Sequence, residues 1–398
     1  MEVDGEEGPL DEGGGPSGAT TQLQRSTGKP PSFFLSKADE CFSSFPPNLE
    51  LAVKFLEKGV SVHPDDVELL QRLAGEYCEL GRGDEAKELL QRAIQLEASP
   101  LKFLQMAQLE EGAACLSLYR TAISLLESSL ASAQSSYVAA ASKHGKKSKG
   151  PAAAAAAAEA QEIKGTLVRA YCSVAELYLT DLCEEEEAEA SATSAVQKAL
   201  ELDPESPDAL LCDAQLKKVQ DDAEGAIRAA KCLYSTLKRL HKRAMKQMMI
   251  NAEDESCLFT SPEEEDSDAF VSIETRVNAA RLFIDVGMVK PALKVLKACL
   301  DENDEDPQVW LVLCCALYKS DDFDSCLSAL DELKQRMKRS GIPEDHSMAV
   351  HERQLRELSK KALKEQEQQQ EVEELEEDEE EDDNDDASSA NYSSDDDR

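Results

Sequence analysis

The chain has 398 residues, of which 81 are Asp or Glu and 43 are Lys or Arg, so its formal net charge is −38. This charge argues against DNA or RNA as a direct ligand, because phosphate backbones are bound through basic surfaces, and it leaves cationic partners open. Apolar residues make up 41% of the chain and aromatic residues only 5%, which favours an all-α protein packed through small residues.

The chain carries no sign of a membrane span or of an export signal. Its longest uncharged apolar runs, 309–318 and the alanine run 152–158, are far shorter than the roughly 20 residues that a membrane helix needs. The N-terminal residues are acidic and lack the basic and apolar regions of a secretory signal, so we expect a reducing compartment with free thiols. The twelve Cys include no Cys-x-x-Cys spacing, and we predict neither a metal site nor a cofactor.

The N-terminal segment 1–32 is rich in Gly, Pro, Ser and Thr, and we expect it to be disordered. From Phe33 the apolar residues recur with helical spacing, and this pattern continues to about Leu363. Two interruptions resemble insertions: a low-complexity segment of Ser, Lys and Ala at 128–160, and an acidic loop at 251–268.

Small residues recur with a period of 34, each followed by a further small or apolar residue four and seven positions later. The pairs are Ala52 with Ala86, Ala192 with Ala226, and Ala292 with Cys326, and Cys115 marks a shorter copy. This period is typical of tetratricopeptide repeats, in which two helices of a hairpin meet at small side chains. We therefore predict a right-handed α-solenoid of about seven repeats with disordered termini.

The period divides the chain into segments. We place repeats 1–3 at 33–127, repeats 4 and 5 at 161–250, repeats 6 and 7 at 269–338, and a capping helix at 344–366. Cys115, Cys314 and Cys326 fall on positions where two helices touch, so we interpret them as small buried hydrophobes and not as redox or metal-binding groups.

The first helix of each repeat is expected to line a binding groove. On this register the predicted partner-binding residues are Glu68, Glu79, Leu104, Glu111, Glu176, Asp208, Leu211, Glu274, Asp285 and Tyr318. Acidic side chains with apolar residues among them suit an extended basic peptide. The alternative is that these are the solvent-facing acids expected in any protein of this charge.

No catalytic constellation is visible in the sequence. It contains no glycine-rich phosphate loop, no Gly-x-Ser-x-Gly, no His-Glu-x-x-His and only five His. We therefore expect a binding protein and not an enzyme.

Two basic segments break the acidic trend. Lys146, Lys147 and Lys149 form a candidate nuclear-import signal. Residues 228–246 contain seven basic residues and no acid, and 253–268 contain eight acids and no base. One interpretation of this second pattern is that the charges of the two segments compensate each other. The alternative is that the acidic loop controls the access of a partner.

The C-terminal segment 367–398 is predicted to be an acidic disordered tail, because thirteen of the sixteen residues from 371 to 386 are acidic. Ser393 and Ser394 each precede an Asp by three positions and are candidate phosphorylation sites.

The segments 101–109, 119–123, 286–296 and 309–318, together with the short third repeat and the acidic tail, resemble the dedicated assembly chaperones of large-subunit ribosomal protein four. The resemblance covers about 33–363, and the insertion at 128–160 departs from it. It implies a monomeric, non-enzymatic protein of cytoplasm and nucleus that shields the basic loop of this client and escorts it to the pre-60S assembly machinery.

Two other functions remain open. A co-chaperone that grips heat-shock chaperone C-termini needs a clamp of Lys, Arg and Asn on successive helices, and only Asn278 and Arg281 fit it. The third possibility is an acidic scaffold or histone chaperone that acts through the tail.

Overall fold

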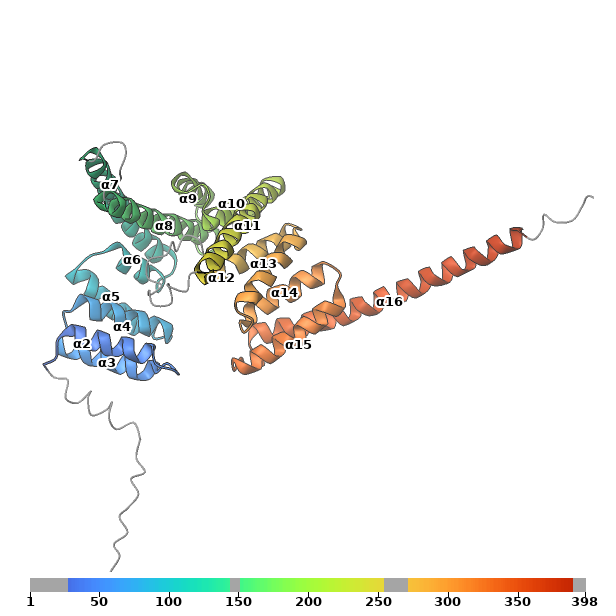
Figure 1. Cartoon of the computed structure of the whole chain (residues 1–398), viewed down its shortest axis with the longest axis horizontal. Helices are drawn as coiled ribbons and strands as arrows, with labels where there is room; N and C mark the ends of the chain where they lie inside the picture. The colour runs from blue at the N-terminus through green and yellow to red at the C-terminus, as the bar shows by residue number, and fades with distance from the viewer. Residues whose placement is uncertain (1–27, 144–150, 254–270, 389–398) are drawn as a thin grey trace, which may run out of the picture. The chain divides into compact units, whose positions relative to one another are not determined.

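The structure is a computed structural model that describes residues 28–143, 151–253 and 271–388. Over these ranges it contains fifteen α-helices and no strand, which confirms the predicted all-α class (Figure 1). None of these described helices is long and apolar enough to cross a membrane. The chain divides into two compact units, residues 1–195 and 196–398.

The first unit consists of helical hairpins followed by a long helix. Consecutive helices contact each other in the pairs α2·α3, α4·α5 and α6·α7, and α7 also packs along α8. The bounds are α2 Pro31–Phe42, α3 Leu49–Val62, α4 Val67–Glu79, α5 Gly83–Leu96, α6 Pro100–Ala107, α7 Gly112–Lys143 and α8 Pro151–Leu179. Helix α9, Ala188–Leu202, crosses the boundary between the units.

The second unit repeats the hairpin arrangement. Its hairpins are α10·α11, α12·α13 and α14·α15, and the first helices of successive hairpins also touch, as α10·α12 and α12·α14. The bounds are α10 Pro207–Val219, α11 Ala223–Glu253, α12 Ile273–Asp285, α13 Val289–Glu302, α14 Pro307–Lys319, α15 Phe323–Arg339 and α16 Ser347–Ser388. Helix α16 packs on α14 and α15 with its N-terminal part.

Local sequence fixes where the hairpins begin and turn. The Asp66 carboxylate accepts a hydrogen bond from the backbone N–H of Leu69 at 2.9 Å and so caps the start of α4. Gly81 follows α4 with a φ of +71°, and Gly287 follows α12 with a φ of +78°. Because a side chain is strained at such angles, glycine allows the sharp turn into the second helix of each hairpin.

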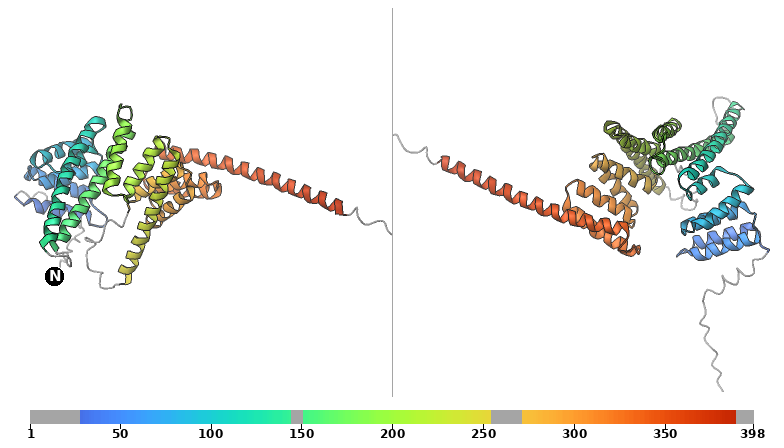
Figure 2. Two further views of the ribbon diagram at one scale, coloured as in Figure 1. Left: turned by 90° about the horizontal axis from the view of Figure 1, so that it is seen from above. Right: turned by 180° about the vertical axis from the view of Figure 1, so that it is seen from behind.

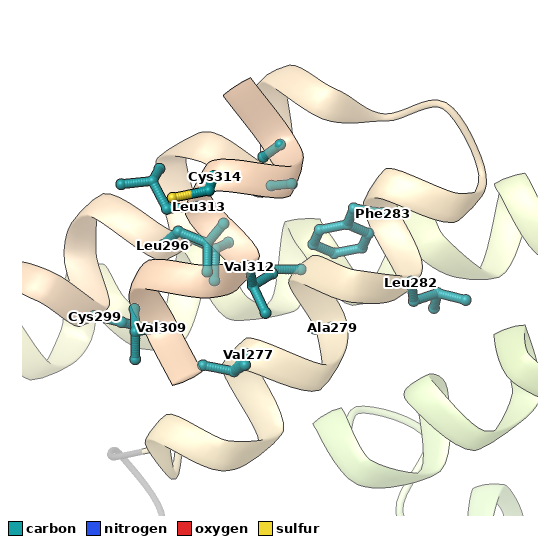
Figure 3. Packing of buried hydrophobic residues seen from close by; sticks show 14 of the residues in the cluster. Val277, Ala279, Leu282, Phe283, Leu296, Cys299, Val309, Val312, Leu313 and Cys314 are labelled. Carbon is teal, nitrogen blue, oxygen red and sulfur yellow. The ribbon is translucent and has the colours of Figure 1, made fainter. Parts of the chain in front are cut away.

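The small residues that define the period lie in the core, as predicted. All seven are buried: Ala52, Ala86, Cys115, Ala192, Ala226, Ala292 and Cys326. In the second unit, Phe283 of α12, Leu296 of α13 and Val312 of α14 pack together at the centre of one cluster (Figure 3). The small residues let the helix axes approach closely enough for these larger side chains to interdigitate.

The three cysteines at tight positions are buried as predicted. The Cys115 thiol donates to the carbonyl of Ala107 at 3.2 Å, and the Cys326 thiol donates to the carbonyl of Cys314 at 3.3 Å. Burial raises the pKa of all three thiols, which keeps them protonated and poorly nucleophilic.

The structure differs from the sequence-based expectations at three segments. The first helix begins at Pro31, inside the segment expected to be disordered. The expected insertion at 128–160 is helical wherever it is described, because α7 continues to Lys143 and α8 starts at Pro151. Helix α16 continues to Ser388 through most of the segment expected to be a disordered tail (Figure 2). Ala, Glu and Gln are strong helix formers even without an apolar face, which accounts for the last two differences.

Candidate peptide-binding faces

In the first unit, one face of α4 presents acidic side chains to solvent. Glu68, Gln71, Gly75 and Glu79 follow each other at three- and four-residue spacing, and the leucines of α4 are buried on the opposite face. Both glutamates are exposed, and Gln71 is half-buried. The Gln71 side-chain amide donates to the Gln105 amide oxygen at 3.2 Å, which joins this face of α4 to α6. We call this surface the α4 face.

Neighbouring acids strengthen the negative potential of the α4 face. Glu76 is half-buried on the same helix, and burial is the main cause of its raised pKa. Arg72 opposes this shift, while the charges of Glu79 and Asp39 add to it. Arg72 pairs with Asp39 at 3.2 Å and with Glu76 at 3.5 Å, so Glu68 and Glu79 are the carboxylates of this face that an approaching cation would meet.

Other predicted residues of the first unit are placed on nearby elements. Leu104 is half-buried on α6, Glu111 is exposed immediately before α7, and Glu176 is exposed on α8. The charge of Glu176 contributes to the raised pKa of Tyr119, whose main cause is burial. As predicted for the groove, exposed acids (Glu111 and Glu176) and a partly buried apolar side chain (Leu104) are therefore found at these positions.

In the second unit, the corresponding helix faces are less open than expected. Asp208 accepts a hydrogen bond from the Thr275 hydroxyl at 2.9 Å, and Asp285 pairs with Lys218. Both contacts connect α10 with α12, so these acids are engaged within the fold. Glu274 is exposed on α12 and remains available.

Two apolar predictions in this unit have different outcomes. Leu211 is 5% exposed and belongs to the hydrophobic cluster, so its predicted position in a groove is wrong. The reason is that α10 packs directly on α12, which covers this position. Tyr318 is half-buried, and its ring lies 5.6 Å from that of Phe323.

The second unit also carries cations among these acids. Arg281 and Lys319 lie close enough to Cys315 to lower the pKa of its thiol, against the larger upward effect of burial. The described faces of α10, α12 and α14 are therefore of mixed charge, whereas the α4 face is acidic.

Sequence reasoning missed a groove in the first unit. It has a volume of about 620 Å³ and lies between α7 and the end of α8, with Leu116, Arg120, Ser124, Tyr178 and Glu185 on its walls. The Arg120 guanidinium donates to the Tyr178 hydroxyl at 2.9 Å. The repeat register gave no signal for this groove, because its lining comes from the second helix of a repeat.

Several predicted sites lie outside the described residues, namely Lys146, Lys147, Lys149, Ser393 and Ser394. Within the described ranges, no group of three or more His, Cys, Asp or Glu side chains is arranged to hold a metal ion. The histidines of those ranges include His63, whose Nε2 lies 2.6 Å from the carbonyl oxygen of Lys29.

No protein-family model matches the chain. A curated protein from Schizosaccharomyces pombe, the probable assembly chaperone of rpl4, is 26% identical over 270 residues, which cover 67% of this chain and 66% of that protein. The match thus spans slightly less than two thirds of that relative, and it confirms the resemblance predicted from the sequence.

A solved structure, the assembly chaperone of RpL4 (residues 1–338), matches with a TM-score of 0.53 and 22% identity, covering 75% of this chain and 99% of that one. Yeast Tom70 matches with a TM-score of 0.42 and 14% identity, covering 85% of this chain and 65% of that one. The first of these supports the tetratricopeptide-type fold.

Proposed function

We propose that this protein is a dedicated chaperone that binds newly made large-subunit ribosomal protein four, shields it, and escorts it to pre-60S ribosome assembly in the nucleus. It acts by binding and not by catalysis, in cytoplasm and nucleus. The resemblance to assembly chaperones of rpl4 and the acidic α4 face support this proposal together.

The α4 face supplies the chemistry for such a client. An extended basic segment presents Lys and Arg side chains at intervals, and Glu68 and Glu79 are exposed acceptors on one helix with no basic partner among the described side chains. The amides of Gln71 and Gln105 offer hydrogen-bonding groups between α4 and α6. Together they allow a peptide backbone and its cations to be held at the same surface.

Charge also accounts for shielding and release. A net charge of −38 repels other polyanions and attracts a basic protein, so the client is kept from non-specific contact with nucleic acid. Ribosomal RNA has a higher linear charge density than any protein face, and it displaces the chaperone by competition once the client reaches its binding site.

Charge reversal on α4 tests the proposal. The double substitution Glu68→Lys with Glu79→Lys should weaken binding of the client's basic loop by about 1–2 kcal/mol, a factor of about 5–30. The matched control is Asp84→Lys with Glu88→Lys on α5, the other helix of the same hairpin, where both acids are exposed. Each pair includes one acid from the first turn of its helix, where a lysine is unfavourable to the helix dipole.

Binding is measured by titration of full-length protein into a labelled loop peptide, with circular dichroism as the check on folding. A loss confined to the α4 pair supports the proposal. If both pairs lower the affinity equally, the client responds to net charge alone, and the α4 face is not its binding surface. If wild-type protein does not bind the loop, the proposed client is wrong.

A further inference from the structure

Helix α11 is longer than its packing requires. It spans 31 residues, whereas its hairpin partner α10 spans 13, and Figure 2 shows it extending beyond the neighbouring helices of its unit. Beyond Leu237, Ala244 is the only described side chain of α11 that is buried. Residues 238–246 of this helix therefore form an exposed arm.

Two of the three arginines of α11 are paired with carboxylates. Arg239 pairs with Glu205 at 2.6 Å, and Arg228 pairs with Glu224 at 3.5 Å. The pKa of Glu205 is lowered mainly by the hydrogen bond from Arg239, and Arg243 contributes to the same shift. The planar guanidinium suits such carboxylate contacts.

The lysines of α11 behave differently. Lys231, Lys238, Lys242 and Lys246 are exposed, and their spacing of seven, four and four residues places them on one side of the helix. None of the four has an ion pair or hydrogen bond with a described residue, although the chain contains almost two acids for each base. At 1.5 Å per residue this row of lysines is about 22 Å long.

Helix α13 also carries exposed lysines. It occupies the place of α11 in the next hairpin, and His241 of α11 lies near enough to Glu302 to affect its pKa, which the hydrogen bond from Arg276 chiefly lowers. Three further exposed lysines of α13 have no described ionic partner: Lys290, Lys294 and Lys297.

We propose that the row of lysines on α11 binds the phosphate backbone of single-stranded RNA. Lysine acts on phosphate as a point charge, whereas Arg228 and Arg239 are already paired with carboxylates. A single row about 22 Å long suits one strand of a polyanion better than it suits a broad, flat anionic surface. The aromatic side chain nearest the row, Tyr234, packs its ring against Phe283 at 5.9 Å and is not free to stack on a base, so binding is independent of sequence.

The net charge of the chain opposes RNA at long range, which is why the sequence argued against it. At physiological salt the Debye length is about 8 Å, so a strand in contact with the arm experiences mainly the local row. The choice of RNA over DNA rests on the proposed function, because ribosomal RNA surrounds the place where the client is delivered. The arm would then hold the complex near RNA while the client is transferred.

The test measures binding of full-length protein to a labelled oligouridylate of about 20 nucleotides by fluorescence anisotropy, at several salt concentrations. One variant changes the four lysines of the row to Gln. The control variant changes four other exposed lysines of the same unit to Gln, so that the net charge falls equally: Lys334, Lys338, Lys360 and Lys364.

We expect the affinity of the row variant for the oligouridylate to fall at least about tenfold at moderate salt. The slope of the logarithm of the binding constant against the logarithm of the salt concentration should be shallower by about 3, because four phosphate contacts are lost. The control should resemble wild type. Equal losses in both variants, or no binding by wild type, would overturn the proposal. So would displacement of the RNA by a poly-glutamate peptide at equal charge concentration, since the row would then bind acidic polypeptide.

A second measurement separates this proposal from the proposed function. The row variant should still bind the client's basic loop with wild-type affinity, because the α4 face is unchanged. Loss of RNA binding with retained client binding supports both ideas. If wild-type protein binds RNA but not the client, the row is still an RNA site, and only the proposed chaperone function is refuted.

Discussion

Gly59 is a position where one methyl group should reveal how closely the first helices pack. It lies on α3, and a Cβ added there would be 2.9 Å from the Cβ of Phe34 and 3.0 Å from a methyl carbon of Leu69. Real Cβ atoms are almost never found this close to a neighbour, and Phe34 is fully buried and has no free space to move into. We therefore expect Gly59→Ala to destabilise the first unit.

Two opposing effects set the size of the change. Replacing Gly by Ala inside a helix favours folding by about 1 kcal/mol, and overpacking a core contact costs about 1–3 kcal/mol. The net loss is then up to about 2 kcal/mol. Gly75 on α4 is the matched control, since nothing lies within 4 Å of its added Cβ. Gly75→Ala should stabilise by about 0.5–1 kcal/mol.

Thermal unfolding of the full-length variants, followed by circular dichroism, checks the difference between them. For a unit of 195 residues, 1 kcal/mol corresponds to a Tm shift of about 2–4 °C, so the two variants should shift in opposite directions. If Gly59→Ala raises the Tm as much as Gly75→Ala does, helix α2 does not pack on α3 through Phe34, and the small-residue packing of the first hairpin is refuted.

Deleting residues 371–398 removes 16 acids and one Arg. The deletion should slow association with the client about tenfold at low salt and change the dissociation rate little. Stopped-flow kinetics at two salt concentrations measure both rates, and faster dissociation would contradict the prediction. Changing Lys146, Lys147 and Lys149 to Ala should reduce nuclear accumulation without weakening client binding; equal nuclear signal in microscopy would exclude them as an import signal. Burial and the hydrogen bond to Glu57 raise the pKa of Tyr77 from 10.0 to about 12. The stability that protonated Tyr77 provides should therefore be full below about pH 10 and lost as the pH rises to about 12. The difference in unfolding free energy between wild type and Tyr77→Phe should shrink over that interval, and a constant difference would refute the shift.

Much of the fold could be predicted because the repeat constrains residue size at fixed positions. Ala86 and Ala292 must be small where two helices cross, and the spacing of such residues reveals the hairpins without any long-range information. Helices α7 and α8 escaped prediction at 128–160 because Ala and Ser there carry no apolar period, although Ala strongly favours a helix.

The candidate site was less predictable because exposure depends on the neighbouring hairpin. Glu68 and Glu79 are exposed as the register indicates, but Leu211 occupies an equivalent kind of position and is covered by α12. Asp285 is engaged by Lys218, which lies 67 residues earlier in the chain. A sequence pattern shows which side of a helix a residue occupies, and only the packing of the next helix decides what remains open.

Among the described helices, every substantial contact joins a helix to the next helix along the chain or to the one after it. A hairpin can therefore close as soon as it and its neighbour have left the ribosome. The first unit, residues 1–195, can be complete while the second is still being made. At about 5–20 residues per second, synthesis of the second unit takes about 10–40 s. The α4 face is thus formed before its own chain is finished. On the proposed function, it can meet a nascent client while both chains are still on ribosomes.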